Sequence, residues 1–174
     1  MSSAINPGPE FSRRVSLTRL GGEPYRQEIV ASEAERDALA RRFELVSLDR
    51  LTAEIELVRE PSGTILLAAS FEAVFEQECI VTLDPVAGSV AERFQLRYGR
   101  PEAEEDAPSG DDDPAFEPLT GEAIDIGEAV AQEFSLALPP FPRAADAVIE
   151  IDDPETSEDG PFSALDKFRR GRSQ

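Results

Sequence analysis

The sequence of 174 residues contains no histidine, the side chain that most often transfers protons in catalysis near neutral pH and most often binds metals. Cys79 is the only cysteine, so the chain cannot form an internal disulfide, which fits a reducing compartment. A single thiol cannot supply a zinc site, and without a neighbouring base it is a weak nucleophile. These absences disfavour both a structural zinc centre and nucleophilic catalysis.

Long apolar runs and basic side chains are also scarce. No run approaches the roughly 18 apolar residues that a membrane-spanning helix needs, so we expect no membrane association. The N-terminal residues lack the apolar core of a secretory signal, and we expect a cytoplasmic protein. With 36 acidic and 17 basic residues the net charge is -19, which argues against binding DNA or RNA broadly through the backbone. The same charge favours basic partner proteins.

Motifs that carry chemistry are missing as well. The sequence has no Walker-type loop, no dinucleotide fingerprint and no nucleophile elbow. The run Asp111-Asp112-Asp113 lacks the alternating ligands and the turn glycine of a calcium loop, and its composition is typical of a solvated linker. We therefore expect no catalytic, cofactor-binding or metal site, and no enzymatic activity.

The first half of the chain predicts strands and one helix. Loose alternation over residues 11–20 and 25–31 indicates two strands. Ser32 with Glu35 forms a capping box, which predicts a helix to about Phe43 with Ala34 and Leu39 facing inward.

Beyond Glu44 the apolar period changes to two, which predicts an antiparallel meander. Strands are expected over residues 51–58, 64–83 and 89–98, with turns at 61–63 and 85–88. The second strand is expected to carry Cys79 as a buried, inert thiol in line with Val81 and Leu83. One face of this sheet should be covered and the other wet.

Composition divides the rest of the chain. Residues 1–10 are expected to be disordered, and residues 11–151 to form a single domain that contains a mobile acidic loop at 100–115. Residues 152–174 are expected to form an acidic linker and a short basic helix that begins at Pro161.

Residues 116–143 contain the most distinctive pattern of the chain. Asp125 and Glu128 form a capping box, and Ile126, Val130 and Phe134 recur on one helical face. Two prolines at 139 and 140 should end this helix. Phe141 then stands between two prolines, where we expect it to be exposed. The predicted fold class is α+β: an antiparallel β-sheet meander flanked by two amphipathic helices, with disordered termini and an acidic loop.

Exposed aromatics beside proline or positive charge are typical of interfaces. The expected partner-binding residues are Phe141, Phe162, Phe168, Lys167, Arg169 and Arg170. Basic side chains also occur near Arg13 and near Arg42, and these would form a phosphate-binding face only if they converged with the basic tail.

Three segments in order resemble the YceD family, the large ribosomal RNA subunit accumulation proteins: FEQECIVTLDPV, then AIDIGEAVAQEFSLALPPFPR, then PFSALDKFRRG. The resemblance covers roughly residues 47–170. It implies a non-enzymatic role in the accumulation of large-subunit ribosomal RNA. Many family members carry Cys-x-x-Cys where this chain has Cys79 and Thr82, and this departure removes the metal or redox function that such a pair implies.

Two binding hypotheses follow, and an enzyme is the least favoured alternative. The first is a ribosome-biogenesis factor that acts by binding a ribosomal protein or a large-subunit ribosomal RNA precursor. The second is an acidic adaptor or chaperone that shields a basic ribosomal protein before assembly.

Overall fold

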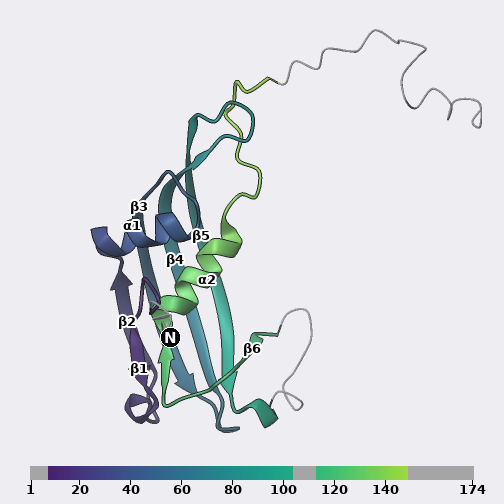
Figure 1. The fold of residues 1–174 in the computed structure, drawn as a ribbon. Helices are drawn as coiled ribbons and strands as arrows, with labels where there is room; N and C mark the ends of the chain where they lie inside the picture. The colour runs from purple at the N-terminus through teal and green to yellow at the C-terminus, as the bar shows by residue number, and fades with distance from the viewer. Residues whose placement is uncertain (1–7, 104–112, 149–174) are drawn as a thin grey trace, which may run out of the picture.

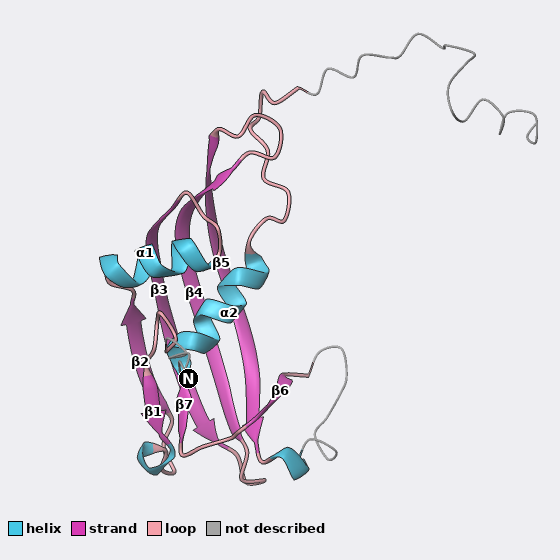
Figure 2. Cartoon of the chain, viewed as in Figure 1, coloured by secondary structure: helices cyan, strands magenta, loops and turns pink. Residues whose placement is uncertain are grey.

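The computed structural model describes residues 8–103 and 113–148. A five-stranded sheet has the order β2 (Tyr25–Val30), β3 (Ser47–Arg59), β4 (Ile65–Glu78), β5 (Pro85–Gly99) and β6 (Ala115–Pro118). The strands β2 to β5 form an antiparallel meander, as predicted, whereas β6 pairs with β5 in parallel. Figure 2 shows the long central strands and the short β6 at one end.

Two short strands and two helices complete the described fold. β1 (Arg14–Ser16) pairs with β7 (Ala123–Asp125) in a separate two-stranded sheet, and short 3₁₀ turns follow β1 and β5 at Leu17–Arg19 and Pro101–Ala103. The helices α1 (Glu33–Arg42) and α2 (Ile126–Ala137) lie over the same face of the large sheet (Figure 1). The predicted α+β class is confirmed, with both helices on one face.

The alternation predicted for β3 and β4 is confirmed by burial. The inward side chains of β3 are Leu51, Ala53, Ile55 and Leu57, and each is at most 3% exposed. Their neighbours point to the opposite face, on which none of the described helices lies and which remains wet. A strand with one buried and one solvated face requires this period of two.

The stripe predicted for α2 forms the centre of the core. Ile126, Val130 and Phe134 are fully buried. The ring of Phe134 lies 5.7 Å from that of Phe75 and 5.8 Å from that of Phe43, in edge-on arrangements that favour aromatic pairs. The predicted stop at the two prolines is also confirmed, since α2 ends at Ala137.

The predicted continuation of the β4 strand through Cys79 and Leu83 is wrong. β4 ends at Glu78, residues 79–84 form a turn, and the turn predicted at 85–88 is the start of β5. The Cys79 N–H donates to the Asp84 carbonyl at 2.9 Å, and Leu83 has a φ of 64°, which no strand residue adopts. The apolar side chains of this turn alternate in the sequence as those of a strand do, although the segment is a turn.

Three smaller expectations also need correction. The predicted strand over residues 11–20 is reduced to β1, because a 3₁₀ turn capped by Ser16 follows it directly. Ala34 is exposed, whereas Leu39 is buried as predicted, together with Ala40. The edge strand β6 pairs with β5 in parallel, whereas the sequence predicts an antiparallel sheet.

Several expected features lie outside the described residues. These are most of the acidic loop, the first seven residues and the tail with Phe162, Lys167, Phe168, Arg169 and Arg170. Glu10, at the end of the expected N-terminal disorder, pairs with Arg42 at 2.9 Å. None of the helices that the structure describes is long and apolar enough to cross a membrane.

Candidate binding surface at the hairpin tip

The chain after α2 docks against the turn that joins β4 and β5. We call the two segments together, residues 79–84 and 139–144, the hairpin tip. The Ile80 N–H donates to the Pro142 carbonyl at 3.0 Å, and the Gln77 side chain donates to the Pro139 carbonyl at 3.2 Å. Two segments that are about 60 positions apart in sequence are therefore joined by one main-chain hydrogen bond and one from a side chain to the main chain.

Large apolar side chains are exposed on this tip. Ile80 is 52% exposed, Leu83 67% and Phe141 73%. Phe141 was expected to be exposed, whereas sequence patterning had assigned Leu83 to the interior. Leu83 also has a left-handed backbone conformation, which costs a non-glycine residue roughly 1 kcal/mol or more. An exposed leucine held in an unfavourable conformation is a feature that folding alone does not require.

Cys79 lies beneath this apolar surface and organises the turn. Its sulfur accepts N–H groups from Val81 and Thr82, both at 3.5 Å, and from Ala144 at 3.4 Å. The side-chain hydrogen bond from Thr82 is the main reason that the pKa of the Cys79 thiol falls to about 7, and the three backbone N–H groups add to it. The thiol is buried, as expected, although it belongs to a turn and has an unusually low pKa.

Thr82 lies three residues after Cys79, and both its backbone N–H and its side chain lower the pKa of the Cys79 thiol. Among the described residues no group of three or more Cys, Asp or Glu side chains is placed to hold a metal ion. The turn therefore closes around the thiol through hydrogen bonds alone.

The other end of α2 has a different character. The Asp125 carboxylate caps the helix through the Glu128 N–H at 3.2 Å, which is half of the predicted capping box; the Glu128 carboxylate pairs with Arg42 and does not return to the Asp125 backbone. The same carboxylate accepts the Arg13 N–H at 2.7 Å and the hydroxyl of Ser12. One side chain thus joins the helix start to the N-terminal strand.

Gly127 allows these two segments to approach closely. A Cβ atom at this position would lie 2.2 Å from the Phe11 carbonyl oxygen. Phe11 itself is fully buried. The Asp125-Ile126-Gly127 part of the distinctive pattern is therefore explained by packing.

Arg13 and Arg42, one from each of two basic clusters, form ion pairs within the fold. Arg13 forms two hydrogen bonds with Glu35, at 2.6 and 3.0 Å, and this arginine is the main reason that the pKa of Glu35 falls to about 2. Arg42 makes a two-pronged pair with Glu128 at 2.9 and 2.7 Å, which raises the pKa of Arg42 and links α1 to α2. Neither guanidinium is free to form a phosphate-binding face.

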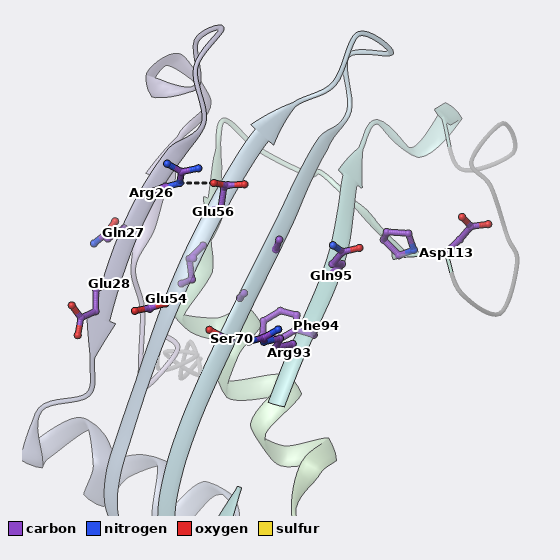
Figure 3. Close-up of a pocket in the computed structure, with 14 residues that line it drawn as sticks. Arg26, Gln27, Glu28, Glu54, Glu56, Ser70, Arg93, Phe94, Gln95 and Asp113 are labelled. Carbon is purple, nitrogen blue, oxygen red and sulfur yellow. Dashed lines mark hydrogen bonds and ion pairs between the residues drawn. The ribbon is translucent and has the colours of Figure 1, made fainter. Parts of the chain in front are cut away.

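The uncovered face of the sheet contains an open hollow of about 950 Å³ (Figure 3). Ala68 and Ser70 contribute small side chains at its centre, and charged side chains from β2, β3 and β5 surround them. Glu28 lies directly opposite Glu54 in the sheet, and neither forms an ion pair with any described residue. Arg93 lies across Ser70 on the neighbouring strand. The hollow has mixed charge and lacks the enclosed walls of a small-molecule site.

The sequence predicts the exposure of Phe141, but it places Ile80 and Leu83 in a strand, because a short apolar turn and a strand have the same composition. The signal that could have separated them is the length of the predicted strand, since 20 residues is far longer than strands usually are.

One of the comparisons with known proteins finds a match. No curated protein and no solved structure matches the chain. Residues 67–168 match the family described as large ribosomal RNA subunit accumulation protein YceD. This match covers β4, β5, the hairpin tip and α2, together with residues beyond them, and it spans more than half of the chain. The chain therefore belongs to the YceD family, whose name associates it with the accumulation of large-subunit ribosomal RNA.

Proposed function

We propose that this chain supports the accumulation of large-subunit ribosomal RNA in the cytoplasm without catalysis, by binding a protein component of the assembling subunit at the hairpin tip. The observation that carries the proposal is the exposed apolar surface of Ile80, Leu83 and Phe141 on a fixed turn. A chain with no histidine has few means of acid–base catalysis at neutral pH, which supports a binding role.

The anatomy of the tip suits recognition of a protein. Phe141 lies between two prolines, and the Pro142 carbonyl accepts the Ile80 N–H, so little backbone freedom remains to be lost on binding. Aromatic side chains in such settings are common centres of binding energy. The net charge of -19 opposes a direct contact with the RNA backbone, which supports a protein partner over an RNA precursor.

The expected contact residues in the tail extend this proposal. Phe162 and Phe168 would add apolar contacts, and Lys167, Arg169 and Arg170 would add positive charge. They lie outside the described residues, so their contribution is to be tested separately by truncating the chain after residue 160.

A second candidate function is an acidic adaptor for a basic ribosomal protein. The like-charged pair of Glu28 and Glu54 supports it, because directly opposed carboxylates are unfavourable in a sheet unless a cation compensates them. Deletion of residues 102–113 should weaken such binding and its dependence on salt. Unchanged binding after this deletion would remove the acidic loop from the adaptor hypothesis.

The central experiment is purification of the tagged full-length protein from its own cells, with and without ribonuclease. We expect a large-subunit protein to be recovered in both conditions. Phe141→Ala should lower its recovery about tenfold, since loss of one central aromatic contact can exceed 1.4 kcal/mol. Leu136→Ala is the matched control, because Leu136 is 79% exposed on α2 but lies outside the tip.

Three results would contradict the proposal. Equal recovery with Phe141→Ala would show that the tip is not the contact. Recovery that vanishes with ribonuclease would indicate RNA as the partner. A loss of folding in Phe141→Ala, measured by circular dichroism, would show that this side chain stabilises the fold.

A further inference from the structure

The outer edge of β5 is mostly unpaired. β5 pairs with β4 from Pro85 to Tyr98, but it pairs with β6 only from Leu96 to Gly99. Among the described residues no strand covers residues 85–95 on that side, and Figure 2 shows β6 beside only one end of β5. Eleven strand residues span about 35 Å, which is longer than an average strand.

The register identifies which backbone groups point outward. The Cys79 N–H bonds to the Asp84 carbonyl, so this opposed pair is of the hydrogen-bonded kind. Pairs in an antiparallel ladder alternate between bonded and non-bonded kinds. Counting along β5 from Asp84, the residues whose N–H and C=O groups point away from β4 include Ser89, Ala91, Arg93 and Gln95. At the far end, the Gly99 carbonyl accepts the Leu119 N–H at 2.7 Å, which agrees with this count.

Most of the features that usually prevent strand addition are missing from this edge. Natural edge strands carry inward charges, prolines, bulges or a covering segment, and of these β5 has one inward charge, Glu92. Here the register of β4 with β5 has no shift, and the only proline of the strand is Pro85 at its start. Ala87, Ser89 and Ala91 place small side chains on the uncovered face beside the free backbone groups. A further strand therefore meets little steric obstruction.

Unpaired carboxylates stand on the inner side of the same edge. Glu92 lies on the inward-facing row of β5, Glu117 on β6 and Glu133 on α2. None of the three forms an ion pair with any described residue. Burial raises the pKa of Glu133, and the nearby Glu117 raises it further, so a cation between them would relieve both effects.

We propose that the free edge of β5 accepts an extended segment of a basic protein as an added strand, with Lys or Arg side chains directed at Glu117 and Glu133. Backbone pairing with Ser89, Ala91 and Arg93 supplies affinity, and the carboxylates select a positively charged segment. A second copy of this chain fits poorly, because it brings the same carboxylates and a net charge of -19. The edge residues are separate from the hairpin tip, so this proposal does not depend on the proposed function of the tip.

The test uses the full-length, isotope-labelled protein and a probe of about seven residues that alternates lysine and valine, the length of one ordinary strand. Amide resonances are followed by nuclear magnetic resonance during titration. We expect shifts and slowed hydrogen exchange at Ser89, Ala91 and Arg93. A peptide that alternates glutamate and valine is the charge control, and it should bind at least about tenfold more weakly.

Ala91→Pro removes one outward N–H without removing a hydrogen bond to β4. It should weaken binding of the probe peptide about tenfold. Ala91→Val is its matched control, because valine suits a strand and keeps the N–H, and it should bind as the unchanged protein does. Circular dichroism of Ala91→Pro must first match that of the unchanged protein. If it does not, Glu117→Gln combined with Glu133→Gln is used instead, which should also weaken binding about tenfold.

Several outcomes would overturn the proposal. Probe-induced shifts at the hairpin tip with none along β5 would place the binding elsewhere. Edge amides that are already protected in the free protein would mean that this chain covers its own edge. A dimer in sedimentation that dissociates with Ala91→Pro would make a second copy the occupant. Equal binding of the lysine and glutamate peptides would remove the role of the carboxylates.

Discussion

The two ends of α2 are opposite in character although they belong to one continuous sequence pattern. At the start, Asp125 and Gly127 hold the N-terminal strand at contact distance, and the neighbouring side chains are buried. At the exit, Phe141 is 73% exposed, and the chain is fixed to the turn at Cys79 mainly through backbone groups.

The difference separates residues that build the fold from residues that the fold presents. Substitutions at the start should destabilise the protein, because they remove buried contacts or introduce a clash. Substitutions at the exit should leave stability nearly unchanged and alter binding, because exposed side chains contribute little to folding. The comparison fails if both ends respond alike.

The largest effect is expected for Gly127→Ala. The added methyl group would lie 2.2 Å from the Phe11 carbonyl oxygen, so the N-terminal strand or the helix must shift. We expect a loss of about 3 kcal/mol, at the upper end of ordinary overpacking effects, measured by urea denaturation. Gly121→Ala is the control, since nothing lies within 4 Å of its Cβ position. Equal stability of the two variants would show that the close approach is absent in solution.

Asp125→Ala is expected to cost less, about 2 kcal/mol. It removes the cap on the Glu128 N–H and leaves the Arg13 N–H without its acceptor. Asp125→Asn should fall between Asp125→Ala and the unchanged protein, because the amide keeps one acceptor oxygen. A loss below about 0.5 kcal/mol for Asp125→Ala, within the range of ordinary surface substitutions, would mean that this end is not locked by the carboxylate.

These two regions also differ in how well the sequence predicts them. The N-cap at Asp125, the stripe ending at Phe134 and the proline stop depend on neighbours within one helix, so local patterns are sufficient to predict them. The contact of Gly127 with Phe11 joins residues 116 positions apart, and no local pattern contains it.

The sequence predicts only part of the hairpin tip, because the rest depends on contacts that no local pattern contains. Phe141 was found because two prolines restrict it, whereas Leu83 was placed in a strand because its neighbours alternate. What makes Leu83 a turn residue is a backbone angle of 64° and the hydrogen bonds around Cys79, and a single sequence shows neither. The parallel pairing of β6 with β5 likewise cannot be predicted from a local sequence pattern.

Leu83→Gly tests the turn against which the exit of α2 docks. The expected change in stability is small, and it can be an increase. Glycine adopts a φ of 64° without strain, so the relief should offset its greater loss of chain entropy. We expect stability within about 1 kcal/mol of the unchanged protein, neutral or slightly increased. Recovery of the partner should fall as it does for Phe141→Ala. A clear loss of stability by urea denaturation would show that Leu83 contributes to the core.

The smallest effect on stability is expected for Thr82→Val. This substitution tests a single atom of the tip, the sulfur of Cys79. Removing the hydroxyl takes away the largest contribution that lowers the pKa of Cys79, so this pKa should rise from about 7 toward the ordinary thiol value. Because Cys79 is the only cysteine, ultraviolet absorbance of the thiolate reports it without interference. A folded pKa below the unfolded one adds stability that is fully present above the unfolded pKa, and this stability is lost as pH falls through about 7. Thr82→Val should reduce that pH dependence and leave stability at acidic pH almost unchanged. An unaltered thiolate titration would assign the low pKa to the backbone N–H groups of Val81, Thr82 and Ala144, and the tip would then depend on its main chain alone.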